Sequence, residues 1–198
     1  YLFSKKPLRS ATDIKGLNIR TNSMISHDLL AGMGANPLNI QFSKVKAALE
    51  AEPLDAAVSC VRCGIGLRWY ESAHYLVGPI TALSHTWITM NRDRWDELPA
   101  DIQAIILEEA KRHEELTRKM SVDIWAEVEE NQNSEMEYIE LTPELKGLAA
   151  EAARTRVLPG WLIRAELPDS EAHRIYNLEV APILKIKINA DGQAEGVK

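Results

Sequence analysis

The alternation of short apolar runs with amphipathic segments divides the first part of the chain into strands and helices. Residues 17–20, 36–42 and 54–59 are apolar runs that predict strands of one mixed sheet. Helical patterns separate these runs, and Asn22 or Ser23 is expected to cap the first helix. The order strand, helix, strand, helix, strand is typical of an α/β fold.

The second half of the chain shows longer helical patterns. Residues 85–91 alternate and predict a fourth strand, and Ser43 is expected to cap the short helix that precedes residue 54. From Pro99 to about Asn131, apolar residues recur at three- and four-residue steps, which predicts a long amphipathic helix. Further short elements are predicted: a strand at 135–141, helices that begin at Pro143 and after Ser170, and a strand with a turn at 183–192.

Composition narrows the classes of protein that remain. The 198 residues suffice for one large domain or two small lobes, and 45% hydrophobic with 26% charged residues is ordinary for a globular chain. The net charge of −6 argues against a nucleic-acid partner, which would require a basic face. No stretch approaches the roughly 20 apolar residues that span a bilayer, so we expect no direct membrane insertion.

Arg20 stands where the first predicted strand gives way to a helix. In open α/β sheets, ligands bind in the crevice outside the carboxyl ends of the strands. A guanidinium matches a carboxylate with two parallel hydrogen bonds, and the helix start at Asn22 and Ser23 adds free N–H groups. This stretch can therefore form an anion clamp, while an ordinary ion pair between Arg20 and a surface Asp or Glu is the more common arrangement for such an arginine.

A second group of polar residues follows the strand at 54–59. Ser59 could donate to a ligand, and Arg62 could supply a second positive charge or point to solvent. Cys60 and Cys63 form a C-x-x-C motif that admits a thioredoxin-like redox pair, a zinc site, or a structural disulfide or small buried pair. Zinc would require two more soft or imidazole ligands, and the histidines show no metal-ligand spacing.

Motifs of common enzyme classes are missing from the sequence. It contains no G-x-S-x-G, no P-loop, no H-E-x-x-H and no G-x-G-x-x-G. We therefore expect no catalytic residues, no cofactor and no metal site. A thiol-dependent enzyme or redox protein that uses the Cys60/Cys63 pair remains as an alternative.

Three stretches of the sequence resemble one known family in its order and spacing. They are "SATDIKGLNIRTNS", "GMGANPLNIQFSKVKAALEAEPLDAA" and "WITMNRDRWDELPADIQAIILEEA". The chain resembles the substrate-binding proteins of TRAP-type (tripartite ATP-independent periplasmic) transporters, the dicarboxylate-binding solute receptors. The resemblance implies a two-lobe fold of the periplasmic-binding-protein type II kind that closes on its ligand.

The same resemblance implies a division of the chain into three parts. Residues 1–8 would be a crossover strand between the lobes, and residues 9–85 would be the second α/β lobe. Residues 86–198 would hold a return strand, a long bracing helix and a C-terminal helical part that packs on the first lobe. Most of that first lobe, and a signal peptide, would precede Tyr1 in a longer protein.

For function, the resemblance implies a periplasmic receptor that delivers a small organic acid to the membrane permease subunits of a TRAP transporter. Arg20 matches the family's carboxylate-binding arginine, and Asn22 and Ser23 follow it in the cleft. The chain departs from the family at the second site, where Val58 and Ser59 replace polar ligand contacts and no ion is expected. The expected ligand-binding residues are Arg20, Asn22, Ser23, Ser59, Cys60, Arg62 and Cys63. A ligand-sensing domain of the same fold is the alternative to a transport receptor.

Overall fold

The computed structural model describes residues 1–51, 53–81, 87–165 and 170–196, and it describes side chains outside residues 121–135. The chain forms two compact units. The first unit combines Tyr1–Thr81 with Glu135–Lys198, and the second comprises Ala82–Ser134.

A six-stranded mixed sheet forms the centre of the first unit, with strand order β3-β2-β4-β1-β5-β6. Strand β2 pairs in parallel with both β3 and β4, and β5 pairs in parallel with β6. Strand β1 lies antiparallel between β4 and β5. The strands are β1 (Leu2–Ser4), β2 (Asn18–Thr21), β3 (Asn36–Asn39), β4 (Ala56–Val58), β5 (Tyr75–Gly78) and β6 (Glu137–Glu140).

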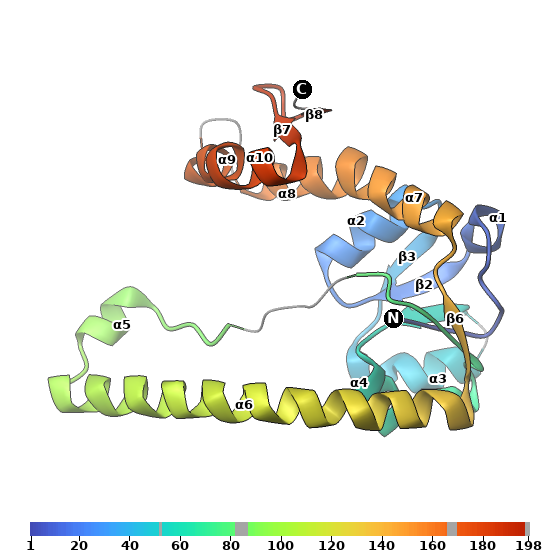
Figure 1. Ribbon diagram of the computed structural model, residues 1–198, viewed down its shortest axis with the longest axis horizontal. Helices are drawn as coiled ribbons and strands as arrows, with labels where there is room; N and C mark the ends of the chain where they lie inside the picture. The colour runs from blue at the N-terminus through green and yellow to red at the C-terminus, as the bar shows by residue number, and fades with distance from the viewer. Residues whose placement is uncertain (52, 82–86, 166–169, 197–198) are drawn as a thin grey trace. The chain divides into compact units, whose positions relative to one another are not determined.

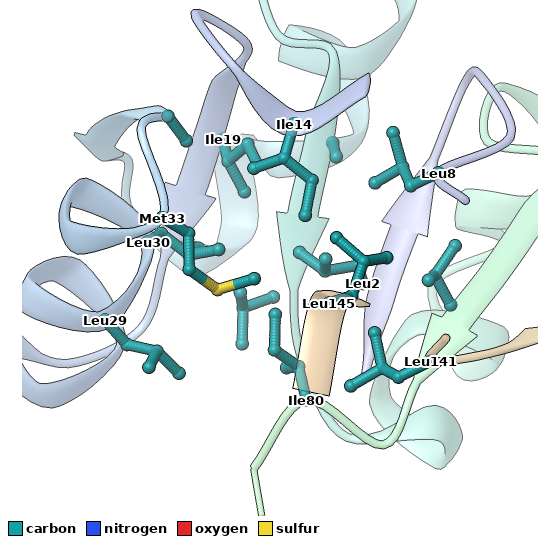
Figure 2. Packing of buried hydrophobic residues seen from close by; sticks show 14 of the residues in the cluster. Leu2, Leu8, Ile14, Ile19, Leu29, Leu30, Met33, Ile80, Leu141 and Leu145 are labelled. Atoms are coloured by element: carbon teal, nitrogen blue, oxygen red, sulfur yellow. The ribbon is translucent and has the colours of Figure 1, made fainter. Parts of the chain in front are cut away.

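One face of this sheet is covered by the helices α1 (Ala11–Ile14), α2 (Met24–Gly32) and α7 (Pro143–Ala152) (Figure 1). Figure 2 shows the core that fills this layer, in which side chains from the strands meet side chains from these helices. Its labelled members are Leu2, Leu8, Ile14, Ile19, Leu29, Leu30, Met33, Ile80, Leu141 and Leu145. Burial of this apolar surface is the main stabilising term for the layer.

The opposite face carries the short helices η1 (Phe42–Lys44), α3 (Val45–Glu50), α4 (Val61–Gly66) and η2 (Trp69–Glu71). Successive residues of a strand point to opposite faces, so Phe3 faces this side while Leu2 faces the other core. Phe3 and Trp69 are fully buried here, with ring centroids 5.3 Å apart. Gly64 lets α4 approach closely, because a Cβ at this position would lie 2.1 Å from the Phe3 ring.

The C-terminal part of the chain continues the first unit. After α7 follow the π-helical segment η3 (Ala153–Val157) and α8 (Leu158–Arg164), of which η3 packs on α2. A small second core of Leu162, Tyr176, Ala181 and Ile188 lies among the last elements. These elements are α9 (Glu171–Ile175), η4 (Tyr176–Val180), α10 (Ala181–Leu184), β7 (Ile186–Ile188) and β8 (Ala194–Gly196).

The second unit contains α5 (Arg92–Asp96) and the 36-residue helix α6 (Ala100–Glu135). The side chain of Asn91 caps α5 by accepting a hydrogen bond from the Arg94 N–H. In the part whose side chains are described, apolar residues of α6 such as Ile105 and Leu116 are more than half exposed. Within the described residues, no helix combines the length and the apolar character that crossing a membrane requires.

The predicted α/β fold is confirmed, and several elements agree with the sequence. The strand at 17–20, the cap at Ser23, the strand at 54–59 and the long helix all occur. The predicted Ser43 cap is wrong, because Phe42–Lys44 already forms a helical turn and Lys44 occupies the position before α3.

The strand predicted at 85–91 also fails in its described part. Residues 85 and 86 lie outside the described residues, and residues 87–91 form no strand. A strand requires a neighbour for its backbone hydrogen bonds, and Ile88 is 89% exposed.

Two elements that follow residue 86 pack on the first part of the chain. Strand β6 pairs with β5 and α7 packs on α2, so these elements belong with residues 1–81. An apolar stripe predicts that a helix is half-buried, but it does not identify the surface against which the helix packs. The packing of the C-terminal part on a further lobe stays a prediction.

Candidate functional site

The carboxyl ends of β3, β2 and β4 bring the predicted ligand-binding residues to one edge of the sheet. Arg20 on β2 is aligned with Leu38 of β3 and with Ala57 of β4. The loops that leave these parallel strands therefore start side by side. This edge is where an open α/β sheet offers a binding crevice.

Arg20 is held tightly within this edge although it is charged. Only 6% of the Arg20 surface is exposed to solvent. Its Nε donates to the Ile40 carbonyl at 3.1 Å, and its Nη1 donates to the Val58 carbonyl at 2.9 Å. These two hydrogen bonds hold the guanidinium between the segment that follows β3 and the end of β4. They therefore fix the orientation of the guanidinium plane.

The Arg20 charge has no acidic partner among the described residues. Burial lowers the pKa of this guanidinium from its usual value because desolvation disfavours the charged form. Arginine nevertheless stays protonated in proteins. The predicted alternative, an ion pair with a surface acid, does not form in the part of the chain described. A positioned charge with N–H groups left over is suited to an anion.

Phe42, Trp69 and Phe3 form an aromatic column that packs against the Arg20 guanidinium, and the sequence pattern did not predict it. The guanidinium carbon lies 5.7 Å from the centroid of the Phe42 ring, within the range of a cation–π interaction. The ring centroids of Phe42 and Trp69 lie 5.6 Å apart, and Trp69 also contacts Phe3. The apolar pattern around Phe42 predicted only the end of a strand. No local sequence pattern indicates that Phe42 contacts Trp69, which is distant in the sequence.

Asn22 and Ser23 lie directly after Arg20 and shape the start of α2. Ser23 Oγ accepts the Ser26 N–H at 3.2 Å, and Asn22 Oδ1 accepts from Ser26 Oγ at 3.0 Å. Both residues are exposed. The predicted cap is therefore confirmed, and the positive end of the nine-residue helix α2 begins at Met24, four residues beyond the buried arginine.

Ser59 and the cysteines lie at the end of β4. Ser59 is 7% exposed and follows Val58, whose carbonyl binds Arg20. Cys60 and Cys63 form a disulfide, and Cys60 Sγ accepts the Cys63 N–H at 3.2 Å at the start of α4. Both cysteines of the chain are thus bonded, which matches the disulfide interpretation and leaves no thiolate to bind zinc in this state.

Arg62 on α4 is exposed, as are Cys60 and Cys63, whereas the flanking Val61 is 5% exposed. Among the described residues, no group of three or more His, Cys, Asp or Glu side chains is arranged to hold a metal ion. A surface hollow on α6 involves one helix of the second unit, and its lining does not include the sheet edge.

Comparison with known sequences identifies the family. The profile described as bacterial extracellular solute-binding protein, family 7 (DctP), matches residues 2–158. The 2,3-diketo-L-gulonate-binding periplasmic protein YiaO of Escherichia coli (strain K12) is 27% identical over 118 residues, which is 59% of this chain and 36% of YiaO.

Solved structures show the same fold. A TRAP periplasmic solute-binding protein from Desulfovibrio desulfuricans, with bound sn-glycerol-3-phosphate, has a TM-score of 0.69 at 20% identity, over 86% of this chain and 55% of that one. The protein from Pseudomonas putida F1, with bound D-glucuronate, has a TM-score of 0.64 at 22% identity, over 77% and 51%. The chain thus spans about half the length of these structures.

These matches confirm the expected resemblance, the type II periplasmic-binding-protein fold and the periplasmic setting. The family consists of solute-binding transport receptors rather than enzymes, so the thiol-enzyme alternative is set aside. The chain belongs to the bacterial extracellular solute-binding protein family 7 (DctP).

Proposed function

We propose that this chain forms the second lobe of an extracytoplasmic solute receptor, which binds a small organic acid and delivers it to TRAP permease subunits. Arg20 holds the carboxylate of the ligand. The predicted neighbours Asn22, Ser23 and Ser59, together with Cys60, border the same pocket. Arg62 and Cys63 complete the predicted set at its outer edge.

The state of Arg20 carries this proposal. A buried guanidinium is ordinarily paired with an acid, because an unpaired charge loses hydration without compensation. Arg20 is 6% exposed and binds only carbonyls and an aromatic ring among the described residues. A bound carboxylate would supply the missing negative charge, in charge-assisted hydrogen bonds that are stronger than neutral ones.

The ligand class follows from the chemistry of the site and from the relatives. YiaO is named for 2,3-diketo-L-gulonate, and solved relatives bind D-glucuronate and L-galactonate. Each of these ligands combines a carboxylate with several hydroxyl groups. A single buried arginine beside small polar groups such as Ser59 suits such an acid, so we propose a sugar acid or a related hydroxy acid as ligand.

Calorimetric titration of the complete protein tests this function. A panel of sugar acids and short mono- and dicarboxylates should contain at least one acid that binds with a Kd of about 1 μM or below. Arg154→Ala is a suitable control, because Arg154 is a partly exposed arginine of the same unit and is paired with Glu151. A protein that binds none of the acids would contradict the proposed function.

A further inference from the structure

The Cys60–Cys63 disulfide closes the first turn of α4 at the edge of the Arg20 site. Cys60 precedes the helix and Cys63 lies in its first turn. Both cysteines are exposed, whereas Val61 and Gly64 of the same turn are buried. The bond is therefore open to a reductant from solvent, although the turn that it closes packs against the core.

One connection between this disulfide and Arg20 runs along the backbone. The Arg20 Nη1 binds the carbonyl of Val58, two residues before Cys60. Ser59 lies between them and its N–H donates to the Tyr1 carbonyl of the chain before β1 at 3.1 Å. A shift of the first turn of α4 would therefore pull on the carbonyl that orients the guanidinium.

A second connection runs through the aromatic column. Gly64 of α4 lies against the Phe3 ring, Phe3 packs on Trp69, and Trp69 packs on Phe42 beneath Arg20. A Cβ at Gly64 would lie 2.1 Å from the Phe3 ring, so a displacement of α4 would also displace this ring. The position of α4 thus affects both the carbonyl and the aromatic ring that hold Arg20.

We propose that the Cys60–Cys63 disulfide is a redox-sensitive element that holds Arg20 in its binding arrangement, so that reduction lowers the affinity of the site for a carboxylate. This inference rests on the proposed function. In the reduction, a dithiol supplies two electrons and two protons, the Sγ–Sγ bond breaks, two thiols form, and the dithiol becomes a cyclic disulfide. Helix α4 has six residues, too few to be stable without the restraint of its surroundings.

The coupling is measured first without a ligand. NMR should follow solvent exchange of the Arg20 Nε–H and of the backbone N–H groups of Cys63 and Gly64, before and after dithiothreitol. We expect exchange to become faster by about tenfold or more, the order that closing a short loop provides. The double variant Cys60→Ser/Cys63→Ser should show the fast exchange already and should not respond to dithiothreitol.

The affinity is measured next, with D-glucuronate as the probe. Its Kd should rise by about tenfold after reduction of the wild-type protein and should be unchanged by reductant in the double variant. If exchange at Arg20 and the Kd are the same in both redox states, the inference is wrong. If D-glucuronate binds neither form, D-glucuronate is not a ligand of this protein, and the exchange measurement still decides whether the disulfide controls Arg20.

Discussion

At the scale of single residues, Arg20 combines features that a purely structural arginine rarely needs. Its Nε and Nη1 donate to backbone carbonyls, and its guanidinium carbon lies over the Phe42 ring. This preorganisation removes most of the rotamer entropy that a flexible side chain loses on binding. The desolvated charge is therefore ready for an anion before one arrives.

Asp13 provides a prediction about pH at the same scale. Its Oδ2 accepts hydrogen bonds from the N–H groups of Arg9 and Ser10 and from Ser10 Oγ. These bonds lower the pKa of Asp13, so the carboxylate stabilises the folded chain above its unfolded pKa. That stabilisation should be lost as pH falls through the lower, folded pKa.

Denaturant unfolding of wild type and Asp13→Asn at a series of pH values between about 2 and 6 measures this effect. The variant should show less loss of stability on the acid side than the wild type does. The control Asp191→Asn, at an exposed turn, should keep the wild-type acid dependence. Parallel curves for the wild type and Asp13→Asn would contradict the assignment.

At the scale of elements, helix α2 is placed by its close contact with the C-terminal part of the chain. A Cβ at Gly32 would lie 2.6 Å from the Cβ of Ala152 on α7. Asn22 and the N-cap residue Ser23 directly precede α2, so this contact helps to position the polar residues beside Arg20. Residues far apart in sequence therefore determine where the site's helix starts.

Gly32→Ala should destabilise the fold by about 1–3 kcal/mol, because the added methyl group overpacks the contact between α2 and α7. Gly147→Ala is the matched control, since nothing lies within 4 Å of a Cβ at that position in α7. It should stabilise by about 0.5–1 kcal/mol through helix propensity. Denaturant unfolding distinguishes the pair, and equal effects of both changes would contradict the packing.

Gly64 and Gly66 form a second pair, on α4. Gly64→Ala should destabilise by about 1–3 kcal/mol, because its methyl group would collide with the Phe3 ring. Gly66→Ala should change stability by less than about 1 kcal/mol, since nothing lies within 4 Å of its Cβ. Thermal unfolding measures both variants, and an unchanged Gly64→Ala protein would disprove the close approach of α4.

Much of this arrangement follows from local sequence patterns, but its long-range contacts do not. The cap at Ser23, the strand before Arg20 and the long helix follow from periodicity and capping chemistry. The pairing of β6 with β5 joins residues about sixty positions apart, and no local pattern encodes it. Phe42 was missed as a support of Arg20 for the same reason.

At the scale of the whole molecule, the described site lies within the first of the two compact units. The family profile ends at residue 158, yet the chain that follows remains attached to that unit. Arg164 of α8 forms an ion pair with Asp28 of α2 at 2.9 Å, and the Asp28 side chain is 15% exposed. This pair links the last elements to the helix that starts beside the site.

Arg164→Met should lower the free energy of unfolding by about 1 kcal/mol, because it leaves a mostly buried carboxylate without its cation. Arg174→Met removes a more exposed pair with Glu171 and should change stability by less than about 0.5 kcal/mol. Urea unfolding of the two variants provides the comparison. A similar loss of unfolding free energy in both variants would contradict the claim that the ion pair between Arg164 and Asp28 stabilises the fold.

The most direct test of the central claim is calorimetric titration of the sugar-acid panel into wild type, Arg20→Met and Arg154→Ala, with circular dichroism to verify folding. The account predicts that one acid binds the wild type and the Arg154→Ala variant alike. Arg20→Met should weaken the binding of that acid by about 1.5–3 kcal/mol, which is roughly 10- to 150-fold in Kd. A folded Arg20→Met protein that binds the acid as tightly as the wild type would contradict the claim that Arg20 holds the ligand carboxylate.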